Sequence, residues 1–276
     1  MLARVYTDEN QIDWSQPVYM QPKLDGVRCI FTKDGAFSRT GKRFMNVKHI
    51  ELELQGLFKQ QPHLILDGEL YNHKLKNDFE KIISLVRKQK PTDTDRLDAQ
   101  HLVQFHVYDY TGQKPNLLEN LKYKGRQDNL TCSDIYCPSI CYTDTKRVAT
   151  PAMIKVLHDK WLDMGYEGSI IRLNGEYEQK RSKNLLKVKD FSDSEAKITG
   201  FVEGKGKRRG TIGKFIAVDS QGMQFGMPVM DKFKYLQDNF KEMQTWIGKI
   251  ATFTYFEKTK RGSYRHPLFK ALRNYE

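Results

Sequence analysis

The sequence predicts an α+β protein with two domains. Its 276 residues are enough for one large domain or two modest ones. Short β-rich runs alternate with a few helical segments up to residue 189. Beyond the polar segment 190–194 the chain becomes a series of short strands with basic turns, which is typical of a small β-barrel. We therefore expect a larger domain at 1–189, a hinge linker at 190–194 and a barrel domain at 195–276.

Local patterns predict the elements of the larger domain. Residues 27–39 form a hairpin, because Lys33-Asp34-Gly35 supplies a turn between two apolar runs. Further strands are expected at 63–72 and 101–110, the second with alternating apolar and polar residues. Helical spacing marks three segments, of which the last has proline in its first turn and ends before a glycine: 47–59, 77–88 and 151–164.

The second domain is predicted to be mostly β-structure and strongly basic. Strands are expected within 195–220, 223–228 and 249–257, with one helix at 230–239. The formal net charge of the chain is +12, and the segment from 195 onward contributes +8 of it. Such a charge indicates a polyanionic partner such as nucleic acid; a solvated basic surface is the alternative.

Composition excludes several classes of protein. Hydrophobic residues make up 39% of the chain, which excludes wholesale disorder. The sequence has no run of eighteen apolar residues and a charged N-terminus, so we expect a cytoplasmic protein without a signal peptide or membrane contact. Neither the seven histidines nor the four cysteines have the spacing of metal ligands, so reduced thiols are expected at Cys29, Cys132, Cys137 and Cys141.

Short charged motifs follow or precede the predicted strands in a fixed order. Lys23 opens the first, where a tight Asp-Gly turn can hold its amine toward a cleft. The motifs, in chain order, are Lys23-Leu24-Asp25-Gly26-Val27-Arg28, Ser38-Arg39-Thr40-Gly41-Lys42, Asp67-Gly68-Glu69-Leu70, Tyr108-Asp109, Glu167-Gly168-Ser169-Ile170-Ile171-Arg172 and Leu186-Lys187-Val188-Lys189.

In order and spacing these segments resemble the motifs of the covalent nucleotidyltransferases, the superfamily of ATP-dependent DNA ligases, RNA ligases and mRNA capping enzymes. The tail from Arg261 to Arg273 resembles the approach to the last motif of DNA ligases. The resemblance spans nearly the whole chain. It implies a nucleotidyltransferase (adenylation) domain with antiparallel sheets and flanking helices, followed by an OB-fold barrel.

The chemistry of these residue types agrees with that resemblance. A lysine is a nucleophile only when neutral, and neighbouring cations such as Lys187, Lys189 and a bound metal would favour the neutral form of Lys23. Attack on the α-phosphate of ATP would then give a Lys–AMP phosphoramidate and pyrophosphate. Glu69 and Glu167 are hard oxygen ligands suited to Mg²⁺ or Mn²⁺.

The resemblance also assigns roles position by position. Lys23 would carry AMP, and Lys187 and Lys189 would stabilise charge on the phosphoryl oxygens. The remaining roles are nucleotide, metal and nick contacts: the ribose for Arg28 and Glu69, adenine for Tyr108, the metal for Glu167, the 5′-phosphate of the nick for Arg39 and the β- and γ-phosphates of ATP for Arg273.

Each of these residues also has a purely structural interpretation. Glu69 could be a charge at a strand end, Glu167 a turn carboxylate and Tyr108 a core aromatic residue. Lys187 and Lys189 alternate with apolar residues, as on any half-buried strand. These interpretations do not explain why the motifs occur together in this order.

Among the members of the superfamily, the sequence favours a minimal ATP-dependent DNA ligase of the viral, phage or bacterial type. It would act as a monomer on nicked duplex DNA in repair, replication or recombination. The tail and two basic stretches support this choice: Lys205, Lys207, Arg208 and Arg209, and residues 258–261. An mRNA capping guanylyltransferase, an RNA ligase and a non-enzymatic, basic OB-containing DNA-binding protein are the alternatives. The end, Arg273-Asn274-Tyr275-Glu276, departs from the R-x-D-K ending common in ligases.

Overall fold

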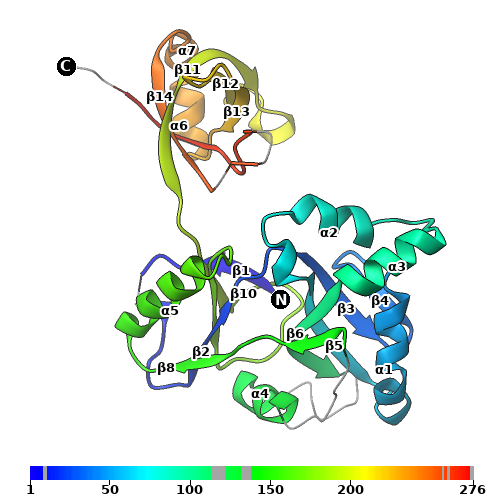
Figure 1. The fold of residues 1–276 in the computed structure, drawn as a ribbon. Helices are drawn as coiled ribbons and strands as arrows, with labels where there is room; N and C mark the ends of the chain where they lie inside the picture. The colour runs from blue at the N-terminus through cyan, green and yellow to red at the C-terminus, as the bar shows by residue number, and fades with distance from the viewer. Residues whose placement is uncertain (9–10, 113–121, 132–137, 257, 260–261, 274–276) are drawn as a thin grey trace. The chain divides into compact units, whose positions relative to one another are not determined.

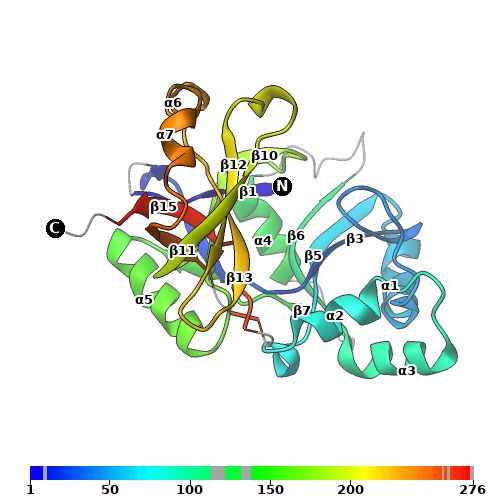
Figure 2. The ribbon, with the colours of Figure 1, turned by 90° about the horizontal axis from the view of Figure 1, so that it is seen from above.

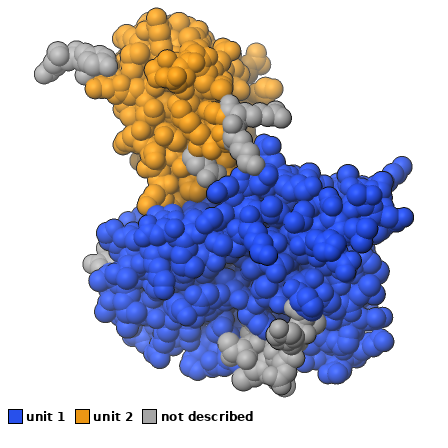
Figure 3. All heavy atoms as spheres, in the orientation of Figure 1, with its two compact units in different colours: residues 1–188 blue, residues 189–276 orange. Residues whose placement is uncertain are grey.

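The computed structural model of the protein describes residues 1–8, 11–112, 122–131, 138–256, 258–259 and 262–273. The chain divides into two compact units, Met1–Val188 and Lys189–Glu276 (Figures 1 and 3). Mixed α and β structure makes up both units, as the sequence predicts. Among the described residues, no helix combines the length and apolar character that a membrane span needs.

The first unit contains two five-stranded sheets, of which the first has the order β4-β3-β5-β6-β7. Pairing is antiparallel except between β6 and β7. The β3–β4 hairpin confirms the predicted turn at residues 33–35. The strands are β3 (Val27–Thr32), β4 (Gly35–Phe37), β5 (Leu64–Tyr71), β6 (Gln104–Gly112) and β7 (Ile140–Tyr142).

The second sheet of this unit has the order β1-β10-β9-β2-β8. Its central strand β9 pairs antiparallel with both β10 and β2, while β1 runs parallel to β10. The strands are β1 (Leu2–Val5), β2 (Val18–Pro22), β8 (Lys146–Val148), β9 (Ser169–Leu173) and β10 (Arg181–Val188).

Helices cover these sheets and supply their apolar cores (Figures 1 and 2). α1 (Lys48–Gln60) buries Ile50, Leu54 and Phe58, four residues apart, against the first sheet. The core of that sheet also takes in buried residues of α2 (Phe79–Val86) and α3 (Asp93–Leu102). α5 (Pro151–Asp163) buries Ile154 and Trp161 against the second sheet. The remaining elements are η2 (His73–Leu75) and α4 (Tyr123–Thr131).

Two sequence predictions in this unit were incomplete. Helix α3 was not predicted, and its last turn includes His101 and Leu102, which the sequence assigned to a strand. A capping box between Thr92 and Asp95 fixes the start of this helix, although it buries only Ala99. Helix α4 lies in the polar stretch 121–147, to which no element was assigned. Its core contacts depend on tyrosine and arginine rather than on an apolar stripe.

The second unit is built on one five-stranded sheet with the order β13-β12-β11-β14-β15. Its core includes Ile198, Phe215 and Phe253, which are fully buried. No pairing between described residues closes the sheet into the predicted barrel. Its elements are β11 (Ser192–Glu203), η4 (Gly206–Arg208), β12 (Ile212–Val218), β13 (Gln224–Pro228), α6 (Phe233–Asp238), α7 (Phe240–Gln244), β14 (Ile250–Tyr255) and β15 (Leu268–Leu272).

The segment expected to be a linker is partly structured. Residues 192–194 are the first residues of β11, where they pair with Tyr255, Thr254 and Phe253 of β14. The polar Ser-Asp-Ser sequence suggested a flexible connection, but these residues pair with β14, and Ser192 and Asp193 remain exposed. Only residues 189–191 lie between β10 and β11.

Candidate active site

Lys23 is held at the end of β2 by main-chain hydrogen bonds to the start of β9. Its N–H donates to the carbonyl oxygen of Gly168 (2.8 Å), and its own carbonyl oxygen accepts from the N–H of Glu167 (3.1 Å). The sheet pairing therefore brings the two predicted residues together, although 144 positions separate them. The Lys23 Nζ forms an ion pair with Glu167 Oε2.

Gly168 permits the close approach of β10 to the start of β9. Its φ of +143° is unfavourable for residues with a side chain, and a Cβ placed there would lie 2.4 Å from the carbonyl oxygen of Val188. Any larger residue would push β10 away from the turn that carries Glu167.

Lys23 lines a pocket of about 140 Å³. Glu69 enters it from β5 and Tyr108 from β6, so the first sheet faces the strand end that carries Lys23. The structure thus brings together four residues that the sequence selected: Lys23, Glu69, Tyr108 and Glu167. Asp67 and Arg172 also line this pocket, and neither was assigned a role from the sequence.

Glu69 has a strongly shifted proton affinity. Its pKa is raised from 4.5 to about 8, mainly by burial and in part by the negative charges of Asp67 and Glu167. The positive charges of Lys23 and Arg28 oppose this shift. A carboxyl group with a raised pKa therefore lies in the same pocket as the Lys23 amine, and strongly shifted pKa values of this kind are common at functional sites.

Arg28 forms a bidentate ion pair with Asp67. Its Nε donates to Oδ1 (2.9 Å) and a terminal nitrogen donates to Oδ2 (2.7 Å). The Tyr177 hydroxyl also donates to Asp67 (2.7 Å), and the α-amino group of Met1 lies 3.8 Å from the same carboxylate. Burial lowers the pKa of this amino group to about 6.

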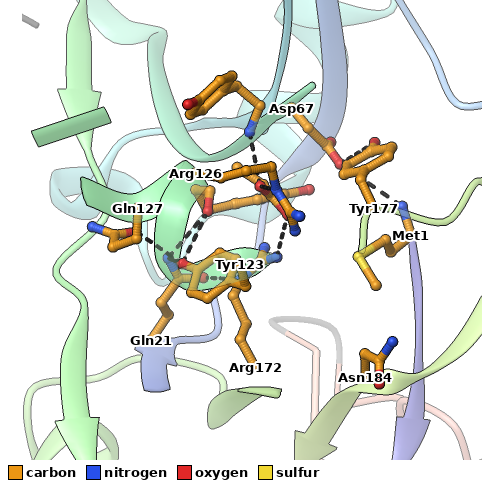
Figure 4. A network of polar contacts seen from close by, with 12 residues as sticks. Met1, Gln21, Asp67, Tyr123, Arg126, Gln127, Arg172, Tyr177 and Asn184 are labelled. Atoms are coloured by element: carbon orange, nitrogen blue, oxygen red, sulfur yellow. Dashed lines mark hydrogen bonds and ion pairs between the residues drawn. The ribbon is translucent and has the colours of Figure 1, made fainter. Parts of the chain in front are cut away.

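A buried polar network lies behind the pocket (Figure 4). Asp109 accepts hydrogen bonds from Arg126 Nε (2.7 Å) and from Arg172 (2.9 Å). Arg172 also donates to the side-chain oxygen of Gln21 (2.5 Å), whose amide nitrogen donates to the Tyr123 hydroxyl (3.1 Å). Sequence reasoning gave these residues no role. A charged residue inside an apolar strand, as at Arg172, is the signal that points to such a partner.

Tyr108 and Tyr123 pack against the same cation. The guanidinium carbon of Arg172 lies 5.0 Å from the centroid of each ring, within the range of cation–π attraction. Arg172 is therefore held by one carboxylate, one amide and two aromatic rings. This arrangement fixes the ring of Tyr108 at the wall of the pocket.

Other predicted site residues lie elsewhere. Lys187 and Lys189 are not among the described residues that line the Lys23 pocket. Lys187 of β10 pairs with Ile170 of β9. The Nζ of Lys189 lies 4.2 Å from the centroid of the Phe256 ring. Arg273 forms an ion pair with Glu195. Arg39 lines a different pocket of the first unit.

The predicted basic stretches belong to the second unit. Lys205, Lys207 and Arg209 are exposed around η4, and a terminal nitrogen of Arg208 donates to the carbonyl oxygen of Asp231 (3.3 Å). Several predicted positions lie outside the described residues: Cys132, Cys137, Lys260, Arg261 and 274–276. Cys29 and Cys141 are free thiols.

The described residues contain no cluster of three or more metal-ligating side chains. Magnesium in phosphate-transfer sites usually takes one or two carboxylates and fills its shell with phosphate oxygens and water. Glu69 and Glu167 supply that number, and their mutual repulsion contributes to the raised pKa of Glu69. A divalent cation would relieve this repulsion, so the donor set fits Mg²⁺.

An amine among carboxylates, in a pocket with an aromatic wall, defines a site suited to nucleotidyl transfer to lysine. The sequence model of the ATP-dependent DNA ligase domain matches residues 1–189. The chain belongs to the ATP-dependent DNA ligase domain family.

Individual relatives support this assignment. The DNA ligase of Haemophilus influenzae is 25% identical over 276 residues, which cover 98% of this chain and 90% of that protein. The DNA ligase of Enterobacteria phage T6 is 26% identical and matches 72% of this chain, but only 50% of its own length.

Solved structures share the fold. A structure from a study of minimal-scaffold DNA binding by Lig E DNA ligases has a TM-score of 0.77 at 22% identity, and the match covers 99% of this chain and 98% of the other. The Chlorella virus DNA ligase–adenylate has a TM-score of 0.53 at 22% identity, with 100% of this chain and 98% of the other covered.

Proposed function

We propose that this protein is an ATP-dependent DNA ligase that seals nicks between a 5′-phosphate and a 3′-hydroxyl in duplex DNA. The observation that carries this proposal is the Lys23 amine, which pairs with Glu167 and lines a pocket together with Glu69 and Tyr108. Membership of the ligase family and the two DNA ligase relatives support the choice of substrate.

The first step is the transfer of AMP from ATP to Lys23. The ammonium group gives a proton to Glu167 Oε2, with which it is paired, and becomes a nucleophile. Its nitrogen forms a bond to the α-phosphorus, the bond from that phosphorus to the bridging oxygen breaks and releases pyrophosphate, and the nitrogen loses a second proton to solvent to give the phosphoramidate. Tyr108 at the pocket wall would stack on adenine, and Arg28 would contact the ribose. Lys187, Lys189 and Arg273 would contact the phosphates.

Two further steps complete the reaction. An oxygen of the nick's 5′-phosphate attacks the AMP phosphorus, the bond to Lys23 Nζ breaks and the amine regains a proton. The 3′-hydroxyl then attacks the activated 5′-phosphate, loses its proton and displaces AMP. Glu69 and Glu167 would hold Mg²⁺, which supplies compensation for the negative charge of the phosphates.

The second unit would supply many of the contacts to DNA. We propose that its sheet is the core of an OB-type barrel that closes over the minor groove, with residues 189–191 as the joint. The strand order, with β11 pairing with both β12 and β14, supports this proposal. Lys205, Lys207, Arg208 and Arg209 would contact backbone phosphates.

The test is intact mass after incubation with ATP and Mg²⁺, for the wild type and for Lys23→Ala, followed by a chase with nicked DNA. We expect one AMP on the wild type alone, its loss on the chase and a sealed strand. An adduct that nicked DNA does not discharge would reject the ligase activity. An adduct formed only with GTP would indicate a capping enzyme, and no adduct on protein freed of bound AMP would indicate a DNA-binding protein.

A further inference from the structure

The first unit has a second pocket, of about 400 Å³, and all the described charged residues that line it are cations. Four cations line it and no described lining residue is a carboxylate; the cations are Arg28, Arg39, Lys42 and Arg87. Arg28 is paired with Asp67, whereas Arg39, Lys42 and Arg87 form no ion pair with another described residue. Cations gathered without counter-charges repel one another and favour an anionic ligand. We call this site the basic pocket.

One wall of the basic pocket is a rigid turn at residues 38–42. The Ser38 N–H donates to the carbonyl oxygen of Lys42 (2.7 Å), and the Lys42 N–H donates to the Ser38 hydroxyl (3.0 Å). Gly41 has a φ of +80°, and its N–H donates to the carbonyl oxygen of Ser38 (3.0 Å). These bonds fix the positions from which Arg39 and Lys42 extend.

The C-terminal end of α2 also lines the basic pocket, through Arg87. Arg87 is the capping residue of this helix, and its N–H donates to the carbonyl oxygen of Ile83 (3.0 Å). A cation at this end of a helix is favoured by the partial negative charge of the last carbonyl groups. The buried Asn46 amide donates to the carbonyl oxygen of Leu85 (3.0 Å), which ties the end of α2 to the segment after the turn. These bonds fix the backbone from which Arg87 extends into the pocket that Arg39 and Lys42 also line.

The basic pocket adjoins the Lys23 pocket. Arg28 lines the basic pocket, while its partner Asp67 lines the Lys23 pocket. Gly26 lines the basic pocket, and a Cβ at this position would lie 2.8 Å from Cγ of Glu69. The Arg28–Asp67 pair and the Gly26–Glu69 contact thus place the two pockets next to each other. A ligand in the basic pocket reaches close to the reacting groups.

We propose that Lys42 and Arg87 bind backbone phosphates of the nicked DNA strand, next to the 5′-phosphate that Arg39 contacts. This inference rests on the proposed ligase function and adds to it two residues that position the strand. Each phosphodiester carries one negative charge, and guanidinium and ammonium groups bind it through charge-assisted hydrogen bonds. The contacts are to the backbone, so they are independent of base sequence.

The experiment measures binding of a nicked duplex with a 5′-phosphate and a 3′-dideoxy end, by fluorescence anisotropy at several salt concentrations in EDTA. The variants are Lys42→Gln and Arg87→Gln. The matched controls are Lys160→Gln and Arg147→Gln, which remove exposed cations outside the basic pocket. Each variant is also tested for Lys23–AMP formation, which needs no DNA.

We expect about tenfold weaker binding for each pocket variant, and a salt slope smaller by about 0.9, with normal Lys23–AMP formation and unchanged controls. A neutral methylphosphonate can replace one backbone phosphate near the nick. At the phosphate that Lys42 or Arg87 binds, this replacement should weaken binding by the wild type but should not weaken binding by the variant that already lacks that cation. Wild-type affinity and slope in both variants, or weakened Lys23–AMP formation, would overturn the inference alone. Failure of the wild type to bind or seal nicked DNA would overturn the ligase proposal and this inference together.

Discussion

Replacing Asp109 by alanine is expected to destabilise the first unit by about 3–5 kcal/mol. The Asp109 side chain is 0% exposed, and its partners Arg126 and Arg172 are 1% and 5% exposed. The substitution leaves two buried guanidinium groups without their counter-charge. Arg126 keeps the carbonyl oxygen of Gly175 (3.2 Å) and Arg172 keeps Gln21 as hydrogen-bond acceptors. The lost stability therefore reflects uncompensated charge more than lost hydrogen bonds.

The assay is urea denaturation followed by tryptophan fluorescence. With a slope of about 2–3 kcal/mol per molar urea, the midpoint should fall by about 1–2 M. Asp98→Ala is the control, because its pair with Lys81 (3.3 Å) is 41% and 45% exposed and is worth less than about 1 kcal/mol. A loss below about 1 kcal/mol in Asp109→Ala would refute the assignment of this cluster as a buried charge centre.

Three further outcomes are expected. Glu69 keeps its proton in the folded state up to about pH 8, whereas the unfolded chain releases it near pH 4.5. The stability of the wild type should therefore fall as the pH rises through this range, and the Tm of Glu69→Gln should increasingly exceed that of the wild type. A constant difference in Tm between the two proteins from about pH 5 to 8.5 contradicts this prediction. Gly168→Ala should slow Lys23–AMP formation more than tenfold in single-turnover assays. Gly200→Ala is the control and should not slow it, because a Cβ at Gly200 would lie in open space. Equal rates for the two variants would show that the close contact between Gly168 and β10 is not needed. Reversing the charges of Lys205, Lys207, Arg208 and Arg209 should weaken binding of nicked duplex and flatten its salt dependence; identical affinities at two salt concentrations would exclude a DNA contact there.

The sequence selected four side chains that the structure brings together, but it did not predict their surroundings. Lys23 follows β2 and Glu167 precedes β9, whereas Glu69 and Tyr108 lie within β5 and β6 of the other sheet. Helix α3 was missed because it buries only Ala99 and so has no apolar stripe, although its capping box was readable from the sequence. The barrel was not confirmed, since strand count alone does not determine closure.

The buried pairing of Asp109 could not be predicted for a different reason. Its partners come from β9 and from a helix in a polar stretch, and which of the chain's 46 basic residues meets it depends on the relative placement of two sheets. A local pattern records the period of a strand but not the element that faces it. The one readable sign was a charged residue at a buried strand position.

The network behind the pocket explains how two separate sheets hold one reaction site. Lys23 follows the end of β2 and Glu167 precedes the start of β9, whereas Glu69 and Tyr108 belong to β5 and β6. Asp109 follows Tyr108 on β6 and binds Arg172 on β9, which in turn binds Gln21 on β2.

Apolar residues of equal volume would pack there as well, and often with greater stability, but they would allow the sheets to slide. Ion pairs and hydrogen bonds are directional, so they hold the two sheets in a single relative position. We therefore expect a double replacement of Asp109 and Arg172 by apolar residues to restore much of the stability lost in Asp109→Ala while leaving Lys23–AMP formation impaired. Recovery of both properties in that variant would assign the network to stability alone.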